Sequence, residues 1–543
     1  MRTGPVRARR VQPAAPDSYA AFAPPRPAAR AVRPPRERGL GARGFTGSAQ
    51  GATSFVDSPP EWRGTSVQVC GLWPFAAGSG SPVVGVPLGQ HLETGATVCG
   101  DPISYFRDAG LISNPSMFLL ARPGLGKSTL VQRMCIGLTA QGVTPLILGD
   151  TRPDYTPVVQ ALGGQVHRIG RGVGGLNVVD PGGLSTVIPR LSGEARRRLE
   201  ADRKGRQETV IGALLELVLH RPLDAPEATA LSTALDLLNA TTVRGTLPVV
   251  AQVIAAGPDR IRSAVLADTD AEYRELTVGL LRAFGTVLSG TFGALFTGAA
   301  DTHLDLGAPA LSLDVSAIPD TDSRLLGAAL LACWTTGFAA IAGAQALADA
   351  GLGPQRYYFA VLDELWLALR AGQGMADRID TITRLNRKFG LGWAMVTHSA
   401  ADLQSLPREE DRRKAAGFIE RAGMVVMGGL SDRELGALSD ITPLSAAERA
   451  RIADWGSAGT LNPVTGAEDD PPGRGHFLIK VGGHPGVPLR MRLTPAENGL
   501  RNSNALWHPT AAPDLRDAGT RDTGTGDAES GDGEGAGGGG DRW

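Results

Sequence analysis

The stretch MFLLARPGLGKST, residues 117–129, decides how the rest of the chain is interpreted. Residues 117–120 are apolar and predict a short buried strand. A glycine-containing loop follows, and then Leu130, Val131 and Met134 recur at helical spacing. A strand, a glycine loop ending in Lys-Ser and a helix form the structural context of a P-loop. The alternative is a chance Gly-Lys-Ser turn after a strand, which the flanking pattern disfavours. The stretch therefore predicts a nucleoside triphosphate site.

Each part of this loop has an expected chemical role. Gly124 and Gly126 would let backbone N–H groups curl around phosphate oxygens, close to the positive end of the helix. Lys127 would reach the β- and γ-phosphates of ATP, and the hydroxyl of Ser128 would hold Mg²⁺. Ala121 replaces the first glycine of the usual pattern and is small enough to be tolerated. The predicted phosphate-binding residues are Ala121, Arg122, Pro123, Gly124, Leu125, Gly126, Lys127, Ser128 and Thr129.

Length and composition bound the architecture. A chain of 543 residues is long enough for about two to four domains. The 54 Lys and Arg residues nearly balance the 55 Asp and Glu residues, so the net charge identifies no polyanionic partner. Residues 1–65 form a basic arm rich in Pro and Arg, and residues 501–543 form a Gly/Asp-rich tail; both are expected to be disordered. The arm could contact nucleic acid or anionic lipid, although a solvated tail is the simpler interpretation.

Cysteine usage and hydropathy favour a cytoplasmic protein. No apolar segment follows the N-terminal arginines, so no secretory signal is predicted. Cys70, Cys99, Cys135 and Cys333 lie far apart without paired spacing, which fits a reducing compartment and argues against zinc. Residues 325–348 are uncharged and imitate a membrane span, but they are mostly Ala and Gly and lie between two predicted strands. We interpret them as a buried helix and expect no transmembrane helix.

The order of periodic segments predicts an α/β fold with a helical insertion. Residues 66–115 form a small β-rich lead-in. Strands then alternate with helices over residues 116–183 and again over 303–500, which indicates a mostly parallel sheet of the RecA-like P-loop type. Residues 184–302 show helical periodicity and are expected to form an all-helical insertion. The expected strands and extended segments cover residues 67–72, 83–88, 95–99, 143–148, 166–169, 175–180, 311–318, 357–362 and 392–397.

Residues 358–364, YFAVLDE, supply the second half of the predicted site. An apolar strand delivers two carboxylates at its C-terminal end, as in a Walker B motif. Asp363 would hold Mg²⁺ through water, and Glu364 would orient or deprotonate the attacking water. A solvated strand end is the alternative, but the pattern lies downstream of a P-loop with strands between. Together the two motifs predict an ATPase.

A further buried strand, GWAMVTHS at residues 392–399, ends in polar residues. In a RecA-like sheet this strand neighbours the P-loop strand, so His398 is a candidate γ-phosphate or water sensor. A strand-end histidine that only caps a neighbouring loop remains the alternative. Arg384, Arg387 and Arg421 are candidate arginine fingers that would act on a neighbouring subunit, although each could instead be a surface ion-pair partner.

The ordered motifs resemble those of the conjugative type IV secretion ATPases, the TraC-like class of the HerA–FtsK superfamily. The resemblance runs from about residue 70 to about residue 497. It is carried by GVPLGQHLETG, LILGDTRPDYTPVVQALGGQVHRIG, GLNVVDPG, GTFGALFTG with LSLDVSAI, LDELWLAL, RLNRKFGLGWAMVTHSAADL and GRGHFLIKVGGHPGVPLRMRLTPAE. Two features depart from the family. Its Thr-Gln sensor is Thr397-His398 here, and little foldable sequence precedes the P-loop strand, so the usual large N-terminal docking domain is expected to be missing or to sit on another polypeptide.

The resemblance implies a motor that binds ATP and Mg²⁺ between the subunits of a hexamer. It would work at the inner face of the cell membrane and power conjugative DNA transfer or assembly of a secretion channel. Its implied partners are further copies of itself, membrane-bound channel proteins and DNA. An FtsK-type double-stranded DNA translocase and a non-hydrolysing nucleotide-binding scaffold are the alternatives. The intact Lys127, Ser128, Asp363 and Glu364 favour hydrolysis over the scaffold.

Overall fold

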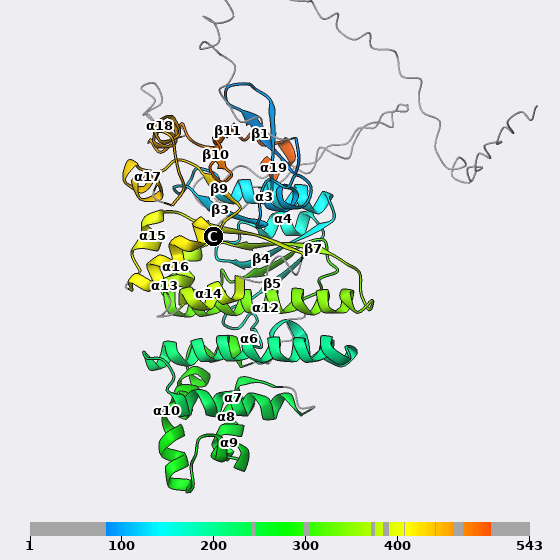
Figure 1. Ribbon diagram of the computed structural model, residues 1–543, viewed down its shortest axis with the longest axis vertical. Helices are drawn as coiled ribbons and strands as arrows, with labels where there is room; N and C mark the ends of the chain where they lie inside the picture. Colours follow the sequence, from blue (N-terminus) through cyan, green and yellow to red (C-terminus); the bar gives the residue numbers. More distant parts are fainter. Residues whose placement is uncertain are drawn as a thin grey trace, which may run out of the picture. The chain divides into compact units, whose positions relative to one another are not determined.

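An eleven-stranded sheet forms the centre of the computed structural model (Figure 1). The structure describes residues 83–241, 245–297, 304–370, 375–383, 390–406, 408–439, 441–457, 459 and 471–500. The N-terminal arm, the C-terminal tail and the strand expected at residues 67–72 lie outside this part of the chain. The strands are β1 Pro87–His91, β2 Thr97–Cys99, β3 Ser116–Leu120, β4 Val143–Asp150, β5 Gln165–Arg168, β6 Leu311–Asp314, β7 Tyr357–Leu362, β8 Leu391–Thr397, β9 Met424–Met427, β10 His476–Lys480 and β11 Val487–Arg490.

The sheet combines a parallel block with an antiparallel extension. Its strand order is β2-β1-β11-β10-β9-β3-β8-β7-β4-β6-β5. Every neighbouring pair from β9 to β5 is parallel, and every pair from β2 to β9 is antiparallel. The predicted α/β class with a mostly parallel sheet is therefore confirmed. The strand β8 lies between β3 and β7, so it neighbours the P-loop strand as expected.

The central strands are buried on both faces. All residues of β3, β4 and β8 are buried. Alternate side chains of a strand point to opposite faces, so an apolar run can serve two cores at once. In β3, Phe118 and Leu120 belong to one apolar cluster, whereas Met117 and Leu119 belong to a second. Helices on both faces hold the P-loop strand in place.

Some of the helices cover the two faces of the sheet, and others form the segment between β5 and β6. Two short 3₁₀ turns, η1 Pro181–Gly183 and η2 Ile188–Arg190, precede the long helix α6. The α-helices are α2 Pro102–Arg107, α3 Lys127–Ala140, α4 Thr156–Ala161, α5 Leu184–Val187, α6 Gly193–Leu219, α7 Ala225–Asn239, α8 Leu247–Ala256, α9 Asp259–Ala264, α10 Asp270–Ser289, α11 Gly293–Phe296, α12 Ser323–Asp349, α13 Leu365–Arg370, α14 Met375–Thr383, α15 Ala400–Gln404, α16 Glu409–Glu420, α17 Asp432–Ser439, α18 Ala446–Trp455 and α19 Pro495–Gly499.

The Ala-rich helix α12 is a core helix, as predicted. Within the described residues it is the one helix long and apolar enough to cross a membrane, and its most apolar window is wholly buried in the protein. It packs against β4 and against α6. Small residues allow this close approach: a Cβ atom on Gly337 would lie 2.4 Å from a Leu148 methyl. The apolar composition of α12 therefore reflects burial between the sheet and α6.

Three expected strands differ from the observed ones. The first was expected at residues 83–88, but β1 begins at Pro87 because Gly85 has a φ of 96° and turns the chain. Residues 175–180 form a turn in which the side chain of Asn177 accepts from Val179 N–H. The strand expected at 311–318 ends at Asp314, whose carboxylate accepts from Ser316 N–H. In each case a local turn interrupts an apolar run, so that only part of the run, or none of it, forms a strand.

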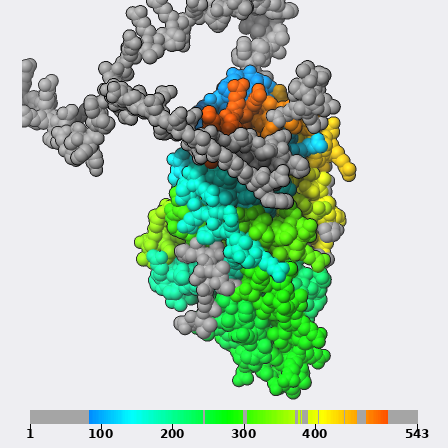
Figure 2. Space-filling model, turned by 180° about the vertical axis from the view of Figure 1, so that it is seen from behind, coloured from blue at the N-terminus to red at the C-terminus, as the bar shows by residue number. Residues whose placement is uncertain are grey.

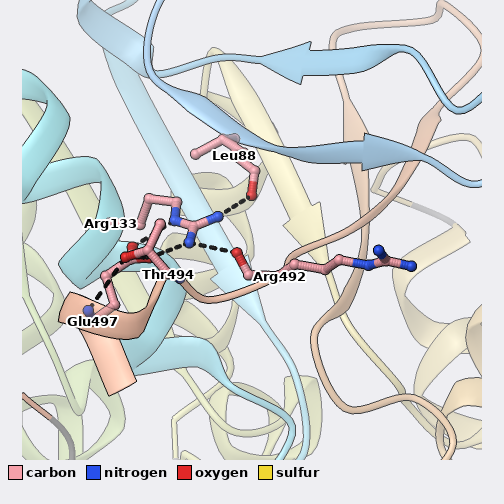
Figure 3. Close-up of polar contacts among 5 residues, drawn as sticks. All are labelled: Leu88, Arg133, Arg492, Thr494 and Glu497. Atoms are coloured by element: carbon pink, nitrogen blue, oxygen red, sulfur yellow. Dashed lines mark hydrogen bonds and ion pairs between the residues drawn. The ribbon is translucent and has the colours of Figure 1, made fainter. Parts of the chain in front are cut away.

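The ends of the described chain meet beside the P-loop helix. The lead-in strand β1 pairs with β11, and Figure 2 shows the orange C-terminal residues against the blue lead-in. Figure 3 shows how Arg133 of α3 joins these segments: its guanidinium forms an ion pair with Glu497 and donates to the carbonyl oxygens of Leu88 (2.9 Å) and Arg492 (2.6 Å). The side chains of Arg133 and Glu497 are only 11% and 14% exposed. This partly buried ion pair links three segments that are distant in sequence.

Replacing Arg133 by Met should destabilise the protein, because the charged carboxylate of Glu497 would remain mostly buried without its partner. We expect the free energy of unfolding to fall by about 3 kcal/mol, as for other ion pairs that lose one buried member. Arg413→Met is the matched control, since its pair with Glu409 is 77% and 68% exposed, and it should cost about 1 kcal/mol or less. Urea denaturation followed by circular dichroism measures both. Equal losses in the two variants would contradict the role of Arg133.

Candidate nucleotide-binding site

The predicted P-loop connects β3 to α3 and has the expected glycine conformations. Gly124 and Gly126 have φ values of 81° and 99°, in the left-handed region that favours glycine. Gly126 stands at the N-terminus of α3, where no side chain caps the first turn. The first N–H groups of a helix have no intrahelical partners, so this end is suited to an anion. The loop residues Arg122, Pro123 and Gly124 are exposed. The arrangement can therefore receive a phosphate group from solvent.

The substitution at the first P-loop position is accommodated by a neighbouring glycine. Ala121 is completely buried. A Cβ atom on Gly428, just after β9, would lie 2.6 Å from the Cβ atom of Ala121. The two backbones are also tied, because Gly428 N–H donates to Leu120 O (2.8 Å) and Arg122 N–H donates to Gly429 O (3.1 Å). The methyl group of Ala121 thus occupies space that Gly428 leaves free.

Lys127 is folded back over the loop. Its side chain is buried, and its Nζ donates to the carbonyl oxygen of Ala121 at 2.8 Å. Burial lowers the pKa of Lys127 to about 8, although the carboxylates of Asp363 and Glu364 oppose this shift. The ammonium group is therefore close enough to Asp363 and Glu364 for their negative charges to favour its protonated form. An incoming phosphate could take the place of these carbonyl contacts.

Two hydroxyl groups follow Lys127 on the first turn of α3. Ser128 is partly exposed, whereas Thr129 is 3% exposed. The Oγ1 atom of Thr129 is buried and has no hydrogen-bond partner within the described residues. Buried polar atoms are almost always satisfied, so this hydroxyl is available to a group that is not part of the chain, such as water or a phosphate oxygen. Together with the open helix end and Lys127, these donors fit a Mg²⁺-bound nucleoside triphosphate.

The two predicted carboxylates lie at the end of β7 and face different neighbours. Glu364 has a φ of 52°, an unusual value for a residue with a side chain, and this turns the chain sharply after Asp363. Asp363 accepts from its own neighbour, Glu364 N–H, at 2.9 Å and from the Tyr155 hydroxyl at 2.8 Å. Glu364 accepts from the indole of Trp366 at 2.6 Å. Because of this turn, the two adjacent acids form hydrogen bonds with different residues.

The ionisation of the two acids is separated as well. The pKa of Asp363 is raised to about 6, mainly by burial and in smaller part by the neighbouring charge of Glu364. Burial alone would also raise the pKa of Glu364, but contacts with His398 and Trp366 outweigh it and lower this pKa. Adjacent groups whose environments separate their pKa values are suited to different chemical tasks. Glu364 is the more readily ionised member of the pair.

His398 contacts the predicted catalytic base. Its Nε2 atom lies 2.8 Å from Oε1 of Glu364, and its Nδ1 atom is buried without a partner within the described residues. The residue was expected either to sense the γ-phosphate or to cap a loop. In the structure His398 lies beside Glu364, the carboxylate that would accept a proton from the attacking water. This contact joins the ends of β7 and β8.

Of the predicted arginine fingers, the structure describes only Arg421. Arg384 and Arg387 lie outside the described residues. Arg421 precedes β9 and forms a 2.8 Å ion pair with Asp380. Because β9 runs parallel to β3, Arg421 lies at the N-terminal edge of the sheet, whereas the P-loop lies at the C-terminal edge. Within one chain, Arg421 therefore cannot reach the predicted phosphate site.

Two residues of the site were not anticipated from the motifs. Asp150 ends β4 and is 2% exposed, and its carboxylate accepts from Tyr155 N–H at 3.0 Å. Tyr155 in turn reaches Asp363. The signal available in the sequence was Asp150 at the end of a buried strand, because parallel strands deliver their C-terminal residues to one edge. The role of Tyr155 has no comparable local signature.

Comparisons with known proteins support the fold. No protein-family model matches the chain, and no characterised protein matches it by sequence. Among solved structures, the chain is similar to VirB4 of Thermoanaerobacter pseudethanolicus, with a TM-score of 0.55, 17% identity, and coverage of 78% of this chain and 99% of that one. It is also matched to the plasmid coupling protein TrwB in complex with ADP and Mg²⁺, with a TM-score of 0.42, 13% identity, and coverage of 70% and 86%. The VirB4 match confirms the α/β fold class.

The buried carboxyl group of Asp150 should make stability fall as pH rises. Burial raises its pKa to about 8. An acid whose pKa is higher in the folded state favours folding below its unfolded pKa, and this contribution is lost as pH rises through the folded value. Asp150→Asn removes the titration and can still accept from Tyr155 N–H. Between pH 5 and pH 8 we expect its free energy of unfolding to fall less than that of wild type, by up to about 1.4 kcal/mol per pH unit.

Urea denaturation at several pH values measures this difference. Asp108→Asn is a suitable control, because the Asp108 side chain is 42% exposed and its hydrogen bond with Arg107 lowers its pKa. Asp108 is ionised in both the folded and unfolded states across this range, so the control should keep the wild-type slope. A wild-type slope in Asp150→Asn as well would show that Asp150 is not protonated in the folded protein.

Proposed function

We propose that the chain is an ATP-hydrolysing motor that powers conjugative DNA transfer or the assembly of a type IV secretion-like channel. The observation that carries the ATPase assignment is the placement of Lys127, Asp363 and Glu364 at the C-terminal edge of neighbouring parallel strands, where the charges of the two acids act on Lys127. The assignment to secretion rests on the order of motifs along the chain and on the similarity in fold to VirB4. We further propose that the protein acts as a hexamer at the inner face of the membrane.

The P-loop would bind and orient the triphosphate. The N–H groups at the start of α3 and around Gly124 and Gly126 would surround the phosphate oxygens. Lys127 would exchange its contacts with loop carbonyls for contacts with the β- and γ-phosphates. Ser128 and Asp363 would hold Mg²⁺, which when bound neutralises charge on these phosphates. The buried hydroxyl of Thr129 would gain a phosphate oxygen as its missing partner.

Glu364 would act as general base toward water. His398 and Trp366 hold its carboxylate oxygens and lower its pKa, so Glu364 is ionised at neutral pH and can accept a proton. When the water attacks the γ-phosphorus, its proton passes to Glu364 and the bond to the β-phosphate oxygen breaks. The departing ADP carries the displaced charge. His398 would fix the direction in which the carboxylate points.

Two substitutions separate nucleotide binding from hydrolysis. Lys127→Ala should abolish both binding and turnover, because it removes the one lysine that faces the phosphate site among the described residues. Glu364→Gln should still bind ATP, whereas its turnover should fall by about 10²- to 10⁴-fold, the usual contribution of a general base. Phosphate release measures turnover, and a fluorescent ATP analogue measures binding. Wild-type turnover in either variant would overturn the ATPase assignment.

Matched controls use the same substitutions elsewhere. Lys204 pairs with Asp236 in the helical segment, and Glu410 is a 73% exposed residue of α16. Lys204→Ala and Glu410→Gln should therefore keep wild-type binding and turnover. Phosphate release with and without DNA, together with the mass in solution with and without nucleotide, tests the motor proposal. Turnover without assembly, or an assembly indifferent to nucleotide, would contradict an intersubunit site.

A further inference from the structure

Tyr155 occupies an unusual position between two acidic strand ends. Its side chain is 1% exposed, and it stands at the end of the loop that leaves β4. Its backbone N–H donates to Asp150 at 3.0 Å, and its hydroxyl donates to Oδ2 of Asp363 at 2.8 Å. Because β4 and β7 are parallel neighbours, the loop after β4 reaches the C-terminal end of β7. Tyr155 therefore bridges two strands at the edge where the nucleotide is proposed to bind.

The ring of Tyr155 is held by the same core that holds the P-loop helix. It belongs to the apolar cluster that contains Leu130, Val131 and Met134 of α3 and Val159 of α4. A ring packed on this cluster has little freedom to rotate or move. The position of its hydroxyl is thus fixed relative to the first turn of α3. A rigid donor of this kind can fix the group to which it donates.

The acceptor is a carboxylate that has one other hydrogen-bond donor within the described residues, Glu364 N–H. Asp363 carries two oxygens, which together offer about four lone-pair directions. The Tyr155 hydroxyl occupies one direction on Oδ2, and Glu364 N–H occupies one on Oδ1. These two donors determine the plane of the carboxylate and the directions that remain. Among the described residues, loss of the hydroxyl would leave the Asp363 side chain with its hydrogen bond on Oδ1.

We propose that Tyr155 is a positioning residue that orients the Asp363 carboxylate toward a nucleotide-bound divalent cation. The inference rests on the proposed function, because it assigns Asp363 to that cation. Groups that orient the ligands of a metal typically affect its affinity about 10- to 100-fold when they are removed. A buried tyrosine that serves only stability has a different kind of partner here: Tyr105 and Tyr273 donate to the backbone carbonyls of Cys99 and Ile254.

Tyr155→Phe removes the hydroxyl and preserves the packed ring. The affinity for Mn²⁺ in the presence of ADP, measured from the electron paramagnetic resonance signal of free Mn²⁺, should weaken about 10-fold or more. Binding of the fluorescent ATP analogue in the presence of EDTA should stay unchanged. The Mg²⁺ concentration that gives half-maximal phosphate release should rise in parallel. Tyr105→Phe, which also loses one buried hydroxyl contact, should leave all three quantities at their wild-type values.

A double-mutant cycle tests whether the effect passes through Asp363. If Tyr155 acts only by orienting this carboxylate, Tyr155→Phe should weaken Mn²⁺ binding no further in an Asp363→Asn background. Unchanged Mn²⁺ affinity in Tyr155→Phe, an equal loss in Tyr105→Phe, or additive effects in the cycle would each overturn the inference. In those cases wild-type ATP hydrolysis would leave the proposed function standing. A wild-type protein that neither hydrolyses ATP nor binds Mn²⁺ with ADP would overturn both.

Discussion

Two adjacent carboxylates, one buried (Glu364) and one partly buried (Asp363), lie at the end of β7, and much of the surrounding structure can be understood from what keeps them together. Buried charges are costly unless each oxygen has a partner. Asp363 and Glu364 meet this requirement with different neighbours, since the left-handed backbone at Glu364 turns one acid toward β4 and the other toward β8. The lysine of the P-loop supplies the opposite charge. A strand order of β3-β8-β7-β4 is what makes all these partners available at one edge.

The parts of the site that the sequence predicts are those with local physical causes. A P-loop is a contiguous strand, turn and helix, so its glycines, Lys127 and Ser128 can be identified from neighbours in the chain. The Asp-Glu pair after β7 is similarly local. The contacts of His398 and Tyr155 cannot be predicted in this way, because each depends on which strands are neighbours. Without the strand order, His398 could be assigned only to a strand end.

The differences in the fold have the same origin. Helix α12 extends close to the limits expected for it, residues 325–348, because a long apolar pattern is sufficient to define it. The strands expected at residues 83–88 and 175–180 were identified from apolar runs, which also occur in buried turns. Gly85 and the side chain of Asn177 give these runs alternative conformations that satisfy the backbone. An apolar run indicates burial, whereas local glycines and polar side chains determine whether it is extended.

The pairing of β1 with β11 has a consequence for how the protein is made. These strands lie about 400 residues apart, so at ribosomal rates of about 5–20 residues per second β1 waits roughly 20–80 s for its partner. Until then β1 can pair only with β2, and a two-stranded hairpin alone is marginally stable. The nascent chain therefore carries an open strand edge while the residues between β1 and β11 are made. Completion of the sheet, and of the contacts of Arg133 with Arg492 and Glu497, must therefore wait until β11 and α19 have been synthesised.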